Sequence, residues 1–140
     1  MNSENSYSTF ETIVPVRPDD IDMNQHVHNS KYLDYVLSAR FDQMERCYQM
    51  PMSEFIERGF SWFVKTAHIS HKRQLHLGDS AIVATKVSKI EGRSCHVEFT
   101  IIRQKTGKIS AEGWFEYVMV CAETGRAVDI PEDIVEAYSV

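Results

Sequence analysis

One short polar segment, residues 17–29, gathers several side chains that could take part in catalysis. Its thirteen residues include three carboxylates, two imidazoles and three amides. Carboxylates and imidazoles attack carbonyl groups, activate water or transfer protons. The same composition also fits a solvated turn before a helix, because acidic side chains stabilise a helix N-terminus. We refer to residues 17–29 as the acidic turn, and its polar residues are Asp19, Asp20, Asp22, Asn24, Gln25, His26, His28 and Asn29.

The residues that follow the acidic turn predict a long helix from position 29 or 30 to Arg46. Its apolar positions recur at helical spacing and are Leu33, Val36, Leu37 and Met44, widened by Tyr32, Tyr35 and Ala39. A helix of about 17 residues is roughly 25 Å long, which is enough to cross a small domain. An apolar face this wide predicts burial on more than one side, with Asn29 or Ser30 as the N-cap.

The rest of the chain predicts strands and two short helices. The predicted strands are residues 12–17, 61–75, 79–90, 93–104 and 108–121, and the predicted short helices are residues 51–59 and 131–138. Pro15 indicates that the first strand lies at a sheet edge or contains a bulge. Gly78, Gly92 and Gly107 lie in the short breaks between the long strands, as antiparallel hairpins require. The prediction is therefore an α+β fold, in which an antiparallel meander of about five strands curves around the long helix.

The acidic turn also resembles the active-site motifs of known thioesterases. Residues 22–32, Asp-Met-Asn-Gln-His-Val-His-Asn-Ser-Lys-Tyr, are similar to the Asp-x-Asn-x-His-Val-x-Asn-x-x-Tyr signature of plant acyl-carrier-protein thioesterases. They also resemble the 4-hydroxybenzoyl-CoA thioesterase family, in which an Asp-x-Asp pair, here Asp20 and Asp22, precedes a Tyr near the helix start, here Tyr32. This resemblance implies a hotdog fold and the hydrolysis of acyl thioesters to free acid and thiol.

The resemblance assigns roles to individual residues of the acidic turn. Asp22 matches the catalytic carboxylate, which acts as nucleophile or as general base, while Asn24 and His26 match the other polar residues of the plant signature. Asp20 is expected to be structural. Free N–H groups at the start of the helix would polarise the thioester carbonyl. The expected substrate-binding residues there are His28, Asn29 and Ser30.

The chain differs from these families at two positions. Asn29 stands where bacterial variants of the 4-hydroxybenzoyl-CoA thioesterase family have Tyr or His, although the plant enzymes also have Asn there. The plant enzymes have a Glu-Cys pair in a later strand, and the comparable region here offers Gln74 and no cysteine.

A small group of basic residues on the predicted sheet gives a second candidate binding region. Lys72 and Arg73 are predicted to contact the phosphates of CoA or phosphopantetheine, with solvation of a strand face as the alternative. His68 and His71 should point to opposite faces of a strand, which favours roles other than metal binding. We expect no metal and no bound cofactor, because CoA or phosphopantetheine would enter as part of the substrate.

Chain length and composition limit the domain organisation, the partners and the cellular location that we expect. The chain has 140 residues and a net charge of −5, which gives no general attraction to nucleic acid or anionic membranes. We expect a flexible tail over residues 1–8, followed by a single hotdog domain over residues 9–140. Neither a membrane span nor a signal peptide is indicated, so we expect a cytoplasmic protein with three reduced cysteines.

Three functions are consistent with these features. The leading hypothesis is a thioesterase that acts on acyl-CoA or acyl-carrier-protein thioesters. The resemblance implies a homodimer or homotetramer, in which paired hotdogs cover the edges that a single curved sheet leaves open. The second is a hotdog hydratase or dehydratase, although those enzymes combine Asp or Glu with His differently. The third is a non-catalytic acyl-CoA-binding hotdog protein.

Overall fold

The computed structural model describes residues 7–140. The elements in chain order are β1 (Thr9–Pro15), η1 (Pro18–Asp20), α1 (Asn29–Arg46), α2 (Met52–Glu57), β2 (Phe60–His71), β3 (Ser80–Glu91), β4 (Ser94–Arg103), β5 (Ile109–Cys121) and α3 (Glu132–Ala137). Residues 1–6 of the predicted tail lie outside the described residues, while Ser8 donates its backbone N–H to the carbonyl of Val140 at 2.6 Å. None of the described helices is long and apolar enough to span a membrane.

The five strands form one antiparallel sheet in the order β1-β3-β4-β5-β2. The predicted α+β fold with about five strands is confirmed, and Pro15 ends an edge strand as expected. The prediction that all four long strands form a meander is wrong, because β2 pairs with β5 and not with β3. Residues 72–79 therefore do not form a hairpin turn and instead carry the chain across the sheet to β3.

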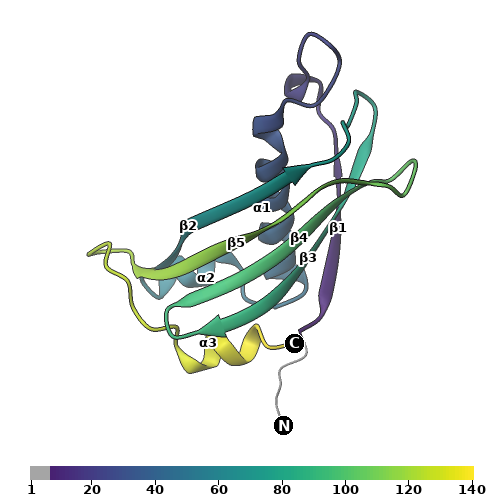
Figure 1. The fold of residues 1–140 in the computed structure, drawn as a ribbon. Coiled ribbons are helices and arrows are strands. Elements are labelled where there is room, and N and C mark those ends of the chain that lie inside the picture. Colours follow the sequence, from purple (N-terminus) through teal and green to yellow (C-terminus); the bar gives the residue numbers. More distant parts are fainter. Residues whose placement is uncertain (1–6) are drawn as a thin grey trace.

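Helix α1 crosses one face of the curved sheet, as Figure 1 shows. Its buried residues are Tyr32, Tyr35, Val36, Ala39, Arg40, Gln43 and Met44. One core cluster packs around the first half of the helix and includes Val36 and Phe99. A second packs around Met44 and includes Phe55 of α2 and Ile134 of α3. The acidic turn lies at one end of α1, and α2 and α3 lie towards the other (Figure 1).

The pairing of β2 with β5 depends on a glycine. A Cβ atom added to Gly113 would lie 1.9 Å from the carbonyl oxygen of His68 and 2.9 Å from the ring of Phe99. Glycine therefore lets the backbone of β2 approach β5 at this point. This approach fixes the path of the strand that leads into residues 72–79, against which the acidic turn packs.

Candidate active site

The centre of the acidic turn is a tight hairpin. The backbone N–H of Asp22 donates to the carbonyl of His26 at 2.9 Å, and the N–H of Gln25 donates back to the carbonyl of Asp22 at 3.1 Å. Gln25 has a φ of 65°, in the left-handed region that a non-glycine residue seldom adopts. The backbone N–H of Val27, in turn, donates to the carbonyl of Leu75 at 2.8 Å. The hairpin is therefore attached to the segment that follows β2.

The carboxylate of Asp22 is held by the backbone of its own turn. Its Oδ1 accepts the N–H groups of Asn24 at 2.9 Å and His26 at 3.1 Å. The N–H of His26 lowers the pKa of Asp22 below its usual 3.8, and that of Asn24 adds to this effect, while desolvation acts in the opposite direction. Its Oδ2 has no hydrogen-bond partner in the described part of the chain. One oxygen of an ionised carboxylate is therefore fixed, and the other is available for chemistry.

Asn24 and His26, the two other predicted catalytic residues, both lie close to Asp22. Asn24 holds Asp22 through its backbone N–H, which donates to Oδ1 of the carboxylate. The ring of His26 lies edge-on to His76, with 4.9 Å between the centroids. The polar groups line an open hollow of about 310 Å³. The residues around it are Asp22, Asn24, His26, Val27, His28, Asn29 and Gln74.

The start of α1 leaves one backbone donor free beside this hollow. His28 is the N-cap, not Asn29 or Ser30 as predicted, because its Nδ1 accepts the N–H of Ser30 at 3.5 Å. The N–H of His28 donates to the carbonyl of Asp20 at 2.9 Å. Among the described residues, the N–H of Asn29 has no partner. Of the three predicted amides, that of Asn29 is therefore the one available to a substrate oxygen.

Two buried hydrogen bonds attach α1 to the acidic turn and to the segment that follows β2. Tyr35 donates its hydroxyl to Asp20 Oδ2 at 2.7 Å, and the Asp20 side chain is buried, in keeping with the structural role expected for it. Desolvation and this carboxylate raise the pKa of Tyr35, so its hydroxyl keeps its proton. Tyr32 accepts the backbone N–H of Leu75 at 2.9 Å. Sequence reasoning treated both tyrosines as apolar residues, although their i,i+3 spacing places both hydroxyls on the side of α1 near the turn.

Lys72 and Arg73 lie beside the hollow but do not line it. Lys72 forms an ion pair with Glu112 at 3.5 Å, and Arg73 donates to the carbonyl of Ile109 at 3.0 Å. Both side chains are exposed, and Gln74, the next residue in the chain, is part of the hollow. The two cations therefore adjoin the hollow in the chain, and both side chains contact β5.

The histidines of β2 face in opposite directions, as their spacing predicted. His68 stacks on Trp114, while His71 packs against Tyr32 of α1. Within residues 7–140, no group of three or more His, Cys, Asp or Glu side chains is placed to hold a metal ion.

These features define a class of protein: a hotdog fold with an ionised aspartate beside the N-terminus of its central helix. A solved structure of a hypothetical protein, TT1821 from Thermus thermophilus, is similar to this chain, with a TM-score of 0.85, 28% identity and coverage of 92% of this chain and 96% of that one. The structure of a DHNA-CoA thioesterase from Staphylococcus aureus is also similar, with a TM-score of 0.83, 20% identity and coverage of 95% and 89%. The hotdog fold is thereby confirmed.

Sequence comparison places the chain in a family. The long-chain acyl-CoA thioesterase FadM of Escherichia coli (strain K12) is 22% identical over 127 residues, which cover 91% of this chain and 95% of FadM. The sequence profile of the Thioesterase-like superfamily matches residues 16–138. This chain belongs to that superfamily, and its class of activity is thioester hydrolysis. The likeness of residues 22–29 to the plant signature remains a prediction.

Proposed function

We propose that this protein hydrolyses acyl-CoA thioesters, with Asp22 and the backbone N–H of Asn29 as the groups that act on the thioester. The observation that carries the proposal is the pairing of a free carboxylate oxygen, Oδ2 of Asp22, with a free amide donor in one hollow. Two of the similar proteins are thioesterases whose names specify a CoA substrate, which supports CoA as the carrier. The exposed cations Lys72 and Arg73, next to Gln74 of the hollow in the chain, fit a phosphate-bearing carrier.

In the proposed reaction, the N–H of Asn29 binds the thioester carbonyl and the carboxylate of Asp22 acts on it. The thioester carbonyl oxygen accepts the N–H of Asn29, which stabilises the negative charge that develops there. Oδ2 of Asp22 then takes a proton from a water molecule that attacks the carbonyl carbon, or attacks that carbon itself to form an anhydride that water hydrolyses. In both routes the C–S bond breaks, and the departing thiolate takes up the proton that water released. His26, at the edge of the hollow, is proposed to hold the attacking water.

The test is the release of free thiol from a panel of acyl-CoA and acyl-carrier-protein thioesters. Asp22→Asn preserves the shape of the side chain, and we expect it to lower kcat by about a thousandfold or more. The matched control is Asp19→Asn, because Asp19 is an exposed acid of the same turn whose side chain pairs with Arg17 at 3.2 Å. Activity of the control should stay within about twofold of the wild type. Full activity of Asp22→Asn, or no thiol release from any thioester, contradicts the proposal.

We further propose that the protein is a homo-oligomer in which a second copy covers the free edge of β2. This strand has 12 residues, pairs on one side only and exposes Phe63 (60%) and Val64 (36%). A long apolar edge of this kind invites pairing with another strand. Analytical ultracentrifugation tests this: the wild type should sediment as a dimer or tetramer, and Phe63→Lys should shift the equilibrium towards monomer. A wild type that is monomeric at micromolar concentration contradicts it.

A further inference from the structure

A second cavity lies along α1, away from the hollow of the acidic turn. It has a volume of about 210 Å³ and is bordered by residues of α1, α2, β2, β4 and β5 and by Tyr138. Its walls are mostly apolar and include Leu37, Met44, Met52 and Trp62. Typical small-molecule sites measure ~300 Å³ or more, so this cavity fits one end of a ligand and not a complete acyl-CoA.

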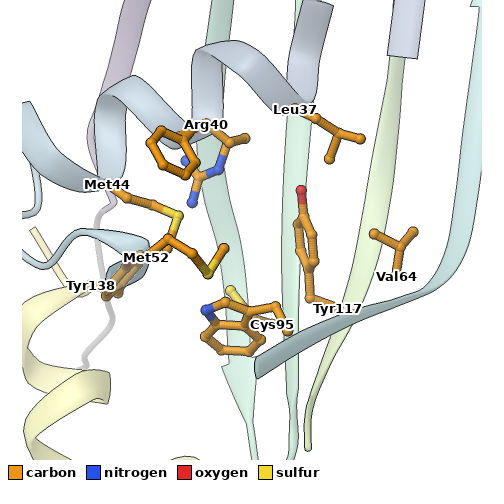
Figure 2. Close-up of a pocket in the computed structure, with 10 residues that line it drawn as sticks. Leu37, Arg40, Met44, Met52, Val64, Cys95, Tyr117 and Tyr138 are labelled. Carbon is orange, nitrogen blue, oxygen red and sulfur yellow. The ribbon is translucent and has the colours of Figure 1, made fainter. Parts of the chain in front are cut away.

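A buried cation, Arg40, lines this apolar cavity. Arg40 is 6% exposed and extends from α1 into the space between Met44, Met52 and Tyr117 (Figure 2). Its Nη1 donates to the hydroxyl of Thr85 at 2.9 Å and reaches that of Tyr48 at 3.5 Å. Nη2 and Nε have no hydrogen-bond partner in the described part of the chain, and neither atom is completely buried.

No negative charge compensates Arg40 among the described residues. Its contacts are two hydroxyls and the ring of Tyr48, whose centroid lies 5.2 Å from the guanidinium carbon. Burial raises the pKa of Cys95 to about 11 and that of Tyr117 to about 12, so both wall residues stay neutral. A buried charge without an ionic partner is costly, and proteins rarely keep one outside a binding site.

The arginine is held in place by a network that leaves its free side facing the cavity. The hydroxyl of Thr85 accepts from Arg40 and donates to Oε1 of Gln43. Gln43 is fully buried, and its Nε2 donates to the hydroxyl of Thr12 at 3.0 Å. The guanidinium therefore keeps its orientation without a ligand, which reduces the entropy lost when a ligand binds.

We infer that this cavity binds the distal end of an acyl group that carries a carboxylate, which would pair with Arg40. The inference rests on the proposed function and specifies its substrate class: thioesters of acids with a second carboxylate at the far end of the chain. Arg40 lies 11 residues after Asn29 in α1, a separation of about 16 Å along the helix axis. An extended acyl chain would span this distance, with its thioester at the acidic turn. A guanidinium fork and a carboxylate match in geometry and charge.

The experiment compares two thioesters of equal chain length, one ending in a methyl group and the other in a carboxylate, over a series of chain lengths. The net charge of −5 gives no general attraction for anions, so a preference for the carboxylate would arise locally. At the best length, kcat/KM of the wild type should favour the carboxylate by about tenfold or more. Arg40→Met should abolish this preference, while Arg126→Met, which changes an exposed arginine outside the cavity, should keep it.

Two results would overturn the inference. One is a wild type that prefers the methyl end at every length, and the other is an Arg40→Met variant that loses activity equally on both substrates, as a purely structural role predicts. If Arg40→Met does not fold, the preference of the wild type between methyl and carboxylate ends still tests the inference.

A binding measurement separates this inference from the proposed function. CoA thioethers with an alkyl or an ω-carboxyalkyl chain cannot be hydrolysed, and calorimetry on the wild type compares their affinities. If no thioester is cleaved but the carboxylate analogue binds about tenfold more tightly, the proposed function is wrong, whereas carboxylate binding in the Arg40 cavity is supported. Equal affinity of the two analogues overturns the inference.

Discussion

The acidic turn and the Arg40 cavity lie along the same helix, but the protein holds their polar groups in different ways. Asp22 is held by backbone N–H groups that lie two and four residues further along the chain. Arg40 is held by side chains from distant segments, among them Thr85, which lies 45 residues away. The first arrangement follows from the conformation of one turn, whereas the second requires the completed fold. Side-chain substitutions should therefore perturb the two regions by different routes.

Of the substitutions that compare these two regions, Asn29→Pro should have the largest effect, because it removes the free amide that lines the hollow at the start of α1. Asn29 is the first residue of the helix, where proline is well tolerated, and His28 has the extended backbone that must precede proline. Asn29→Pro should therefore fold normally but lower kcat by about a hundredfold or more, since one oxyanion donor is lost. Asn29→Ala keeps the N–H and serves as the control in the same steady-state assay. Equal kcat values for the two variants would exclude this amide from catalysis.

A smaller effect should follow from releasing the acidic turn from α1. Tyr35→Phe removes the hydroxyl that donates to the buried carboxylate of Asp20. Loss of this hydrogen bond should lower the free energy of unfolding by about 2 kcal/mol, measured by urea denaturation. It should also lower kcat on all thioesters alike, without changing the preference between methyl and carboxylate chain ends. A changed preference would show that the two regions are coupled.

The converse substitution perturbs the Arg40 cavity. Thr85→Val removes the hydroxyl that links Arg40 to Gln43 and should lower the free energy of unfolding by about 1 to 2 kcal/mol. Its kcat on substrates with a methyl end should stay near that of the wild type, while the preference for carboxylate ends should fall. Thr66→Val is the control, because Thr66 bonds to Glu116 at 3.4 Å away from the cavity. A loss of kcat on both kinds of substrate would contradict the separation of the two regions.

The smallest effect should come from a change in residues 72–79, the segment against which the acidic turn packs. Asp79 accepts the backbone N–H of His76 and Nε of Arg103, both at 2.8 Å. Burial raises the pKa of Asp79, but the bonds from Arg103 and His76 outweigh it and bring the pKa below 3.8. A carboxyl whose pKa is lowered by folding stabilises the protein above its unfolded-state pKa, and this contribution is lost as the pH falls through the folded-state pKa.

Asp79→Asn should therefore be less stable than the wild type by about 1 kcal/mol at neutral pH, and the difference should begin to shrink near pH 4. Denaturant unfolding over a pH series measures this. Asp129→Asn, which changes an acid paired with Arg93 at 3.6 Å and 84% exposed, should show little difference at any pH. A difference for Asp79→Asn that persists unchanged into acid would show that its charge does not contribute.

The contrast between the two regions also explains how far the sequence could predict the molecule. The acidic turn, α1 and the ranges of β3, β4 and β5 were predictable, because each depends on contiguous residues and on local periodicity. The pairing of β2 with β5 was not predictable, since a break that contains glycine, such as that at Gly78, is compatible with both a hairpin turn and a crossover connection. The residues around the hollow were predicted except for Val27, and Gln74 was noted only for comparison with the plant enzymes.

Arg40 was missed for a related reason. It lies in phase with Tyr32, Val36 and Met44, four residues apart along the buried stripe of α1, and that phase was the one available signal. A charged residue on such a stripe is usually read as exposed, and the hydroxyl that holds it comes from a strand distant in sequence. The exposed Leu37, by contrast, was predicted to be buried, and it lies at the edge of the Arg40 cavity with 41% exposure.

The most direct test of the central claim is a crystal structure with a bound acyl-CoA analogue in which a methylene group replaces the thioester sulfur. Such a ketone keeps the carbonyl but has no thiolate to release. The account predicts that its oxygen accepts the N–H of Asn29 and that Oδ2 of Asp22 lies ~3 to 3.5 Å from the carbonyl carbon or contacts a water at that distance. A carbonyl bound away from both groups would contradict the account.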